Sequence, residues 1–151
     1  MSRDMPEDQS GDDVPLLFRS RRRMPKTELR TYFDDVTRRL ARGRRITCLI
    51  STDRELRRLN RQFLGKTYAP DVLSFPSHGG GEIAISADRA AAQASAYGHT
   101  LADEIRILML HGVLHLTGLD HETDSGEMAR AEMRWRRKLG LPAGLIQRTR
   151  T

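Results

Sequence analysis

The sequence lacks the features of a membrane-spanning or secreted protein. Its 151 residues contain no apolar run of the roughly 18 residues that a membrane-spanning helix requires. Residues 1–15 are acidic and polar, without the apolar core of a secretion signal. With a single cysteine, Cys48, the chain cannot form an intramolecular disulfide bond. These absences predict a cytoplasmic protein that does not enter a membrane.

The one cysteine lies within an apolar run, residues 46–50, with the sequence Ile-Thr-Cys-Leu-Ile. A buried free thiol behaves as a small hydrophobic group. We therefore predict that Cys48 contributes to the core and has no redox role.

Charge is distributed unevenly along the chain. The net charge is +6, yet residues 1–15 hold one arginine against five acidic residues, a net charge of about −4. Residues 16–151 therefore carry about +10, nearly all as arginine. This excess is consistent with a polyanionic partner such as RNA, and equally with a solvated basic surface. Charge alone does not separate these two interpretations.

The first half of the chain predicts alternating strands and helices behind a disordered acidic tail, residues 1–15. Leu16–Phe18 is typical of a short strand, and Pro25 suits the first turn of a helix that ends at Gly43. Arg45–Ser51 is rich in β-formers and predicts an interior strand. The helix between them has apolar residues at helical spacing: Leu29, Phe33, Val36 and Leu40.

A second helix is predicted from the capping box Thr52–Glu55 to Gly65. Val72–Pro76 then predicts a strand that ends or lies at an edge at its proline. Residues 78–81 predict a flexible connection, and Glu82–Ser86 another short strand. The apolar face of the second helix consists of Leu56, Leu59 and Phe63.

The second half is helical. Helices are predicted for Ala87–Tyr97 and from Thr100 to Gly118, and a last helix is predicted to begin at a capping box formed by Asp124 and Glu127. Strands followed by helices predict an α+β fold, with a small mixed sheet packed against about five helices in a single domain, residues 16–145. The apolar face of the last helix consists of Met128, Trp135 and Leu139.

Three of the five histidines lie within residues 111–121, as HGVLHLTGLDH. The four-residue offset places His111 and His115 on one face of a helix. Gly118 accepts a positive φ that ends the helix and turns the chain back, so that His121 can supply a third nitrogen. Three imidazoles suit one zinc ion and leave its fourth position open, which is typical of a hydrolytic site. The alternative, three unrelated histidines, does not account for the glycine before the third.

The same segment matches the long zincin pattern, H-E-x-x-H-x-x-G-x-x-H, except at one position. Gly112 stands where a zinc protease has its glutamate general base. Without that carboxylate, metal-bound water lacks a proton acceptor for peptide hydrolysis. The metal ligands are therefore zincin-like, while the metallopeptidase interpretation is disfavoured.

Several blocks resemble the YbeY family of single-domain bacterial metalloproteins. HGVLHLTGLDH is similar to its H-G-x-L-H-L-x-G-x-D-H signature. Residues 71–76, DVLSFP, and 81–86, GEIAIS, resemble two further family segments, as do Leu59-Asn60 and Gly65-Lys66. Met128 and Glu132 match the methionine and glutamate of its last helix.

This resemblance, over about residues 46–140, implies a zincin-like α+β domain with the metal site on a C-terminal helix and the loop after it. It also implies a cytoplasmic endoribonuclease of 16S rRNA maturation and ribosome quality control. One zinc ion per chain and contacts with rRNA and the small ribosomal subunit follow from it.

The chain departs from the family just before Gly65, where Leu64 replaces an arginine associated with nuclease action. A cation there would face the scissile phosphate. Arg61, one helical turn earlier, is a candidate substitute or an ordinary exposed residue. Lys66 keeps its family position and is a candidate phosphate contact.

No general base can be assigned. Glu104 lies two turns before His111 on the same predicted helix, where it either orients a ligand or pairs with a surface arginine. Asp120 either holds His121 in its ligating tautomer or shapes the turn.

The sequence therefore predicts a zinc-dependent hydrolase of RNA phosphodiester bonds. One alternative is a ribosome-assembly binding factor in which zinc stabilises the fold, and a less favoured one is a metallopeptidase.

Overall fold

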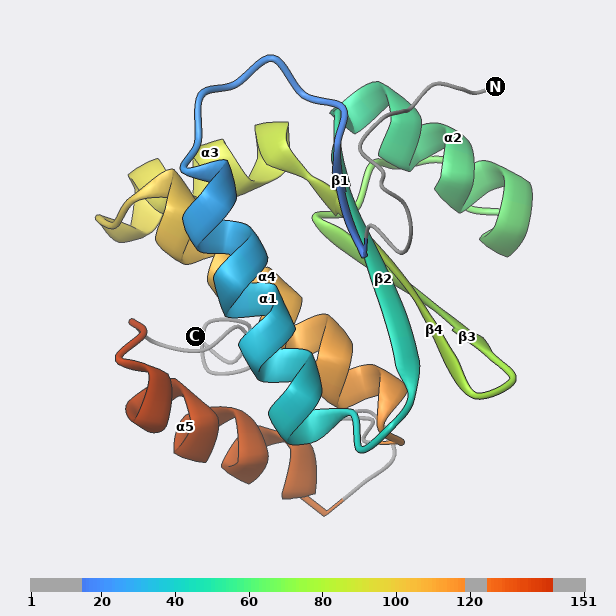
Figure 1. Ribbon diagram of the computed structural model, residues 1–151. Helices are drawn as coiled ribbons and strands as arrows, with labels where there is room; N and C mark the ends of the chain where they lie inside the picture. Colours follow the sequence, from blue (N-terminus) through green and yellow to red (C-terminus); the bar gives the residue numbers. More distant parts are fainter. Residues whose placement is uncertain (1–14, 119–124, 143–151) are drawn as a thin grey trace.

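The computed structural model describes residues 15–118 and 125–142. In this part of the chain four strands and five helices alternate at first, and the last three elements are all helices (Figure 1). The elements are β1 Leu16–Phe18, α1 Lys26–Leu40, β2 Arg45–Ser51, α2 Asp53–Leu64, β3 Val72–Ser77, β4 Gly80–Ser86, α3 Ala87–Tyr97, α4 Leu101–Leu116 and α5 Glu127–Leu139.

The strands form one mixed sheet in the order β1-β2-β4-β3. β1, β2 and β4 are parallel, and β3 pairs antiparallel with β4 at the edge. The edge position agrees with the prediction from Pro76, because a proline removes one donor from the strand ladder. The predicted α+β class, with a small mixed sheet and five helices, is confirmed.

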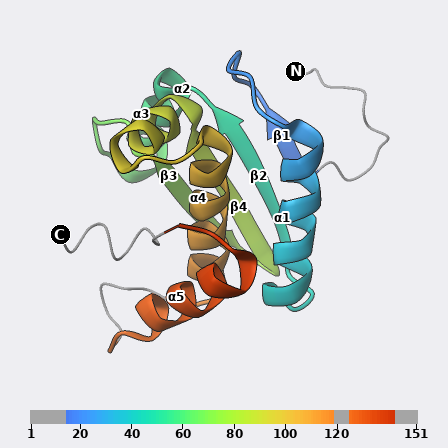
Figure 2. The same ribbon diagram turned by 90° about the vertical axis from the view of Figure 1, so that its left-hand side faces the viewer.

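The helices cover the two faces of the sheet unequally. α1, α3 and α4 lie on one face, and α2 lies on the other (Figures 1 and 2). α5 packs on α4, on the side away from the sheet. α4 is therefore enclosed between the sheet and other helices, which explains why most of its residues are apolar and buried.

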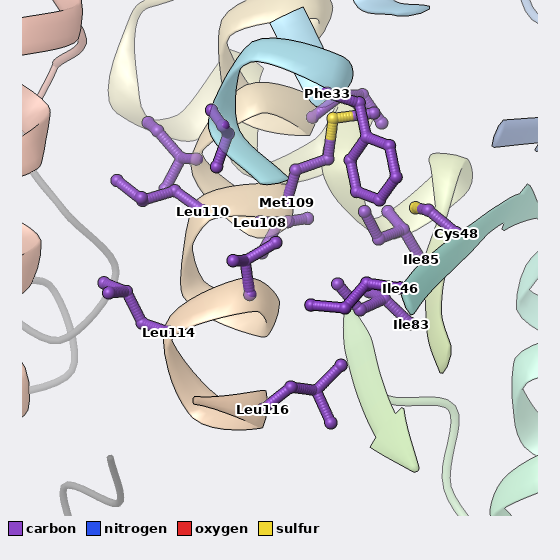
Figure 3. Close-up of a cluster of buried hydrophobic side chains, with 14 of the residues drawn as sticks. Phe33, Ile46, Cys48, Ile83, Ile85, Leu108, Met109, Leu110, Leu114 and Leu116 are labelled. Carbon is purple, nitrogen blue, oxygen red and sulfur yellow. The ribbon is translucent and has the colours of Figure 1, made fainter. Parts of the chain in front are cut away.

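The main core lies between α1, α4 and the inner face of β2 and β4 (Figure 3). Alternation along β2 turns Ile46, Cys48 and Ile50 inward. All four apolar positions predicted for α1 are buried. A smaller cluster of Leu56, Leu73 and Ala84 joins α2 to the other face.

Cys48 is a core residue, as predicted. Burial raises the pKa of its thiol far above the usual value, because the thiolate would be desolvated. The thiol therefore stays protonated and unreactive at neutral pH.

The N-terminal caps of α2 and α5 differ from the predicted capping boxes. Thr52 caps α2 by accepting from the Glu55 backbone N–H, but the Glu55 carboxylate accepts a hydrogen bond from Ser51 Oγ at 2.6 Å, so the capping box is only half formed. α5 begins at Glu127 with Gly126 as its N-cap, two residues later than the predicted cap, Asp124, which lies outside the described residues. Gly126 has a φ of 97°, a conformation that favours glycine, and the helix begins directly after it.

The connection predicted at residues 78–81 is shorter in the structure. β4 already begins at Gly80, which leaves a two-residue hairpin loop. A Cβ at Gly80 would overlap the backbone of Arg45, so this glycine permits close strand contact. Phe63, predicted on the buried face of α2, is 57% exposed, and its ring meets that of Phe75 edge-on.

Within the described residues, no helix is both long and apolar enough to cross a membrane. The acidic tail predicted at residues 1–15 lies outside the described part of the chain, apart from Pro15.

Candidate metal centre

The two helical histidines of the predicted metal site lie together on α4. The rings of His111 and His115 stack with their centroids 6.3 Å apart and their planes 13° from parallel. This is the geometry expected one turn apart on a helix, so the prediction of a shared face is confirmed. Both residues are half-buried. Metal binding by this pair stays a prediction.

The chain turns where the third ligand requires it. α4 ends at Leu116, and Gly118 has a φ of 103°, which favours glycine over any other residue. The predicted end of the helix is therefore confirmed. His121 and Asp120 lie outside the described residues. Within residues 15–118 and 125–142, no three potential ligands are grouped closely enough to hold a metal, and the three-histidine site stays a prediction.

His111 has a carboxylate neighbour on another helix. Glu132 of α5 is buried, and its Oε1 lies 3.3 Å from His111 Nδ1. A carboxylate at Nδ1 favours the tautomer with its proton on that nitrogen, which leaves the lone pair on Nε2. Sequence reasoning matched Glu132 to the family without giving it a role. The detectable signal was an acidic residue four positions after Met128, on the apolar face of α5.

Glu104, predicted to orient a ligand or to pair with an arginine, has an imidazole partner, and its predicted role stays untested. Its Oε1 lies 2.6 Å from His99 Nε2, and its side chain is fully buried. His99 lies just before the N-cap of α4, so the pair links the segment that leads into this helix to the beginning of the helix. Sequence reasoning missed His99.

Gly112 explains why this helix has no protease-type glutamate. A Cβ at this position would lie 2.8–3.0 Å from three atoms of the Ile83 side chain. Real Cβ contacts are almost never this short. α4 and β4 can therefore lie this close together because Gly112 has no side chain. Position 112 faces the sheet and has no room for a carboxylate.

The candidate RNA contacts lie on the far side of the sheet. Arg61 and Lys66 are exposed at the end of α2, and Leu64 is 51% exposed between them. The Asn60 side chain donates to the Tyr68 carbonyl at 2.9 Å, which holds the loop after α2. α2 and α4 both touch the edge strand β3, from opposite faces. The structure therefore places Arg61 and Lys66, at the end of α2, across the edge strand β3 from the helix that carries His111 and His115.

A separate polar network occupies the carboxyl ends of β2 and β4. Asp53, at the start of α2, accepts from Ser86 Oγ at 2.5 Å, while its backbone N–H donates to Asp88 at 2.8 Å. That backbone hydrogen bond, with help from Arg22, lowers the pKa of Asp88, although partial burial opposes the shift. The network joins the first turns of α2 and α3, so it stabilises two helix starts.

Glu55 belongs to the same network. Burial alone would raise its pKa, but hydrogen bonds from Ser51 and Arg58 and the charges of Arg19 and Arg58 outweigh burial and lower it. Its carboxylate is thus held ionised by internal partners.

Comparison with known proteins adds family information to this geometry. The family model described as Endoribonuclease YbeY matches residues 18–140. A protein named Endoribonuclease YbeY from Solibacter usitatus is 57% identical over 136 residues, covering 86% of this chain and 92% of the relative. One of the same name from Koribacter versatilis is 53% identical, covering 69% and 70%. The solution structure of TM1509 from Thermotoga maritima shares the fold, with a TM-score of 0.59, 23% identity, and coverage of 80% and 84%.

Proposed function

Because the chain belongs to the endoribonuclease YbeY family, we propose that it is a zinc-dependent endoribonuclease that cuts single-stranded RNA. We place this activity in 16S rRNA maturation and ribosome quality control, in the cytoplasm, with rRNA and the small ribosomal subunit as partners. The observation that supports the metal part is the stacked pair His111 and His115, with Glu132 beside the first ring.

The donor set fits zinc. Two imidazoles project from adjacent turns of one helix, and His121 follows the glycine that ends it. Three neutral imidazoles with one open position are a common ligand set for catalytic zinc. When bound, zinc supplies a water of lowered pKa and positive charge near the scissile phosphate.

The chain's own groups have separate tasks in this proposal. Glu132 orients the His111 ring and keeps its proton on Nδ1. Arg61 and Lys66 contact RNA phosphates from the other side of β3. Glu104 and Asp120 remain candidates for outer positions around the ligands. No described residue is assigned as a general base.

A second function is favoured by one observation. Leu64 presents a half-exposed apolar side chain where the family has an arginine. A chain without that cation fits a ribosome-assembly binding factor in which zinc only stabilises the fold. A metallopeptidase is disfavoured, because position 112 faces Ile83 and has no space for its base.

The test is metal analysis and RNA cleavage on the same preparation. We expect about one zinc per chain. We also expect cleavage of a single-stranded RNA, and His115→Ala should remove most of the metal and the activity together. If His115→Ala loses both its metal and its folding stability while the wild type cuts no RNA, the binding-factor function is supported. A metal-free protein with equal stability and activity would refute zinc dependence.

A further inference from the structure

The C-terminal ends of α1 and α4 lie near α5 (Figure 1). A basic pocket lies there, beside the last turn of α4. Its volume is about 430 Å³, within the range of pockets that hold small ligands. The lining includes four arginines and no acidic residue. They are Arg39, Arg42, Arg44 and Arg134. We call this cavity the arginine pocket.

Within the described residues, three of the four charges have no carboxylate partner. Arg39 lies 3.6 Å from Asp35, but among the described residues no carboxylate forms an ion pair with Arg42, Arg44 or Arg134. Arg44 instead donates to the Leu116 carbonyl at 3.2 Å, which ties the pocket to the end of the histidine helix. Like charges in one cavity repel one another, so a bound anion would relieve an unfavourable arrangement.

The backbone at Arg42 supports a binding role. Arg42 has a φ of 51°, the only positive φ of a non-glycine residue in the described chain, and glycine follows it. Such a conformation costs an arginine roughly 1 kcal/mol relative to glycine. The fold thus keeps a charged side chain at a position that would suit glycine better, and strain of this kind clusters at binding sites.

The aromatic side chain that lines the pocket contacts two cationic groups. Trp135 has the Arg39 guanidinium 5.7 Å and the Lys138 ammonium 4.7 Å from its ring centroid. These contacts hold the cations near the pocket and occupy the ring, which a nucleobase would otherwise stack on. The pocket is therefore built to recognise negative charge and not base identity.

We propose that the arginine pocket binds the phosphates of an RNA strand, as a further contact site beside the last turn of α4. This rests on the proposed RNA substrate but does not require bound metal. Guanidinium groups pair with phosphate in bidentate fashion, and three of them, two from the loop before β2 and one from α5, match a chain of phosphates better than a single small anion. Recognition would be independent of sequence.

The test measures binding of a fluorescent single-stranded 2′-O-methyl oligoribonucleotide, which resists cleavage, to the full-length protein as purified. The variant is Arg42→Gly with Arg134→Gln, because glycine suits the backbone at position 42. Its RNA affinity should fall roughly tenfold at low salt. The slope of log K against log salt should fall by about 1.4, since each lost contact with single-stranded RNA accounts for about 0.7.

Arg137→Gln is the matched control, an exposed arginine on α5 outside the pocket, and it should change affinity less than twofold. Melting temperatures establish that both variants fold. If the double variant does not fold, Arg134→Glu alone carries the test and should weaken binding by at least about fivefold. Unchanged RNA affinity would overturn the proposal and favour an acidic protein partner. Inorganic phosphate binding that disappears in the variant, with RNA affinity unchanged, would assign the pocket to a free anion and also overturn it.

Discussion

The two ends of the sheet differ in whether their charged side chains have partners within the described protein. At the carboxyl ends of β2 and β4, Asp53, Glu55 and Asp88 are joined to serines, backbone N–H groups and arginines of their own fold. At the other end, beside the last turn of α4, three arginines of the described chain lack carboxylate partners. Groups that satisfy one another stabilise the fold, whereas groups left uncompensated are available to a ligand. The comparison separates structural polar residues from functional ones without reference to the family.

The largest effect is expected at Gly112, where the histidine helix meets the sheet. Gly112→Ala should destabilise the protein by roughly 2 kcal/mol, because overpacking against Ile83 outweighs the gain of about 1 kcal/mol in helix propensity. Chemical denaturation of both proteins measures this difference.

The control for that prediction is the same substitution in an Ile83→Ala background. Removing the Ile83 side chain should relieve the clash, so Gly112→Ala should cost less there than in the wild type. Equal costs in both backgrounds would show that Ile83 is not what excludes a side chain at position 112.

Leu64→Arg tests whether the α2 side of β3 takes part in cleavage. An arginine that stabilises developing charge on the phosphate should raise the rate on single-stranded RNA at least about tenfold, equivalent to roughly 1.4 kcal/mol. Binding should improve less than turnover, because a phosphate contact adds similar affinity to the ground and transition states. Single-turnover assays separate the two.

Leu64→Arg combined with His111→Ala should abolish the gain, since the proposed metal site is then incomplete. Efficient cleavage by the wild type would mean that another cation, with Arg61 the first candidate, already supplies the charge. No cleavage by either protein with zinc, manganese or magnesium would support the binding factor.

A substitution at Glu55 tests the end of the sheet at which the carboxylates are paired within the protein. Its folded-state pKa lies below the usual value, so its contribution to stability is present above the unfolded pKa of about 4.3 and is lost as pH falls through the folded pKa. Glu55→Gln should therefore destabilise the protein by roughly 1 kcal/mol at pH 7, and the difference should shrink below about pH 4. Urea unfolding at several pH values measures it.

Glu82→Gln serves as the control, because Glu82 is exposed and has no ion pair within the described residues. Its effect should stay within about 0.5 kcal/mol at each pH. A pH-independent loss for Glu55→Gln would show that the carboxylate charge contributes nothing.

The smallest effect on stability is expected for the acidic tail. Because residues 1–15 carry about −4, their removal should leave the melting temperature nearly unchanged and strengthen RNA binding modestly at low salt. The gain should fade as salt screens the charge. A large drop in melting temperature would mean that the tail is part of the folded domain.

The sequence by itself determined the elements and the histidine pair. Local signals were sufficient there, since apolar spacing defines α1, Thr100 caps α4, and a four-residue offset stacks His111 on His115. The half-formed capping box at Glu55 and the later start of α5 show where such local signals lose to neighbouring groups. His121 remains a prediction from spacing.

Only the tertiary structure decided which distant groups meet. Glu132 reaches His111 across 21 residues, Gly112 faces Ile83, and Arg44 meets the end of α4 across 72 residues. No periodicity encodes such contacts, because they depend on how helices pack on the sheet and on each other. The sequence alone does not show which of its many arginines are paired with carboxylates. The packing of the elements determines which arginines form such pairs and which line an open cavity.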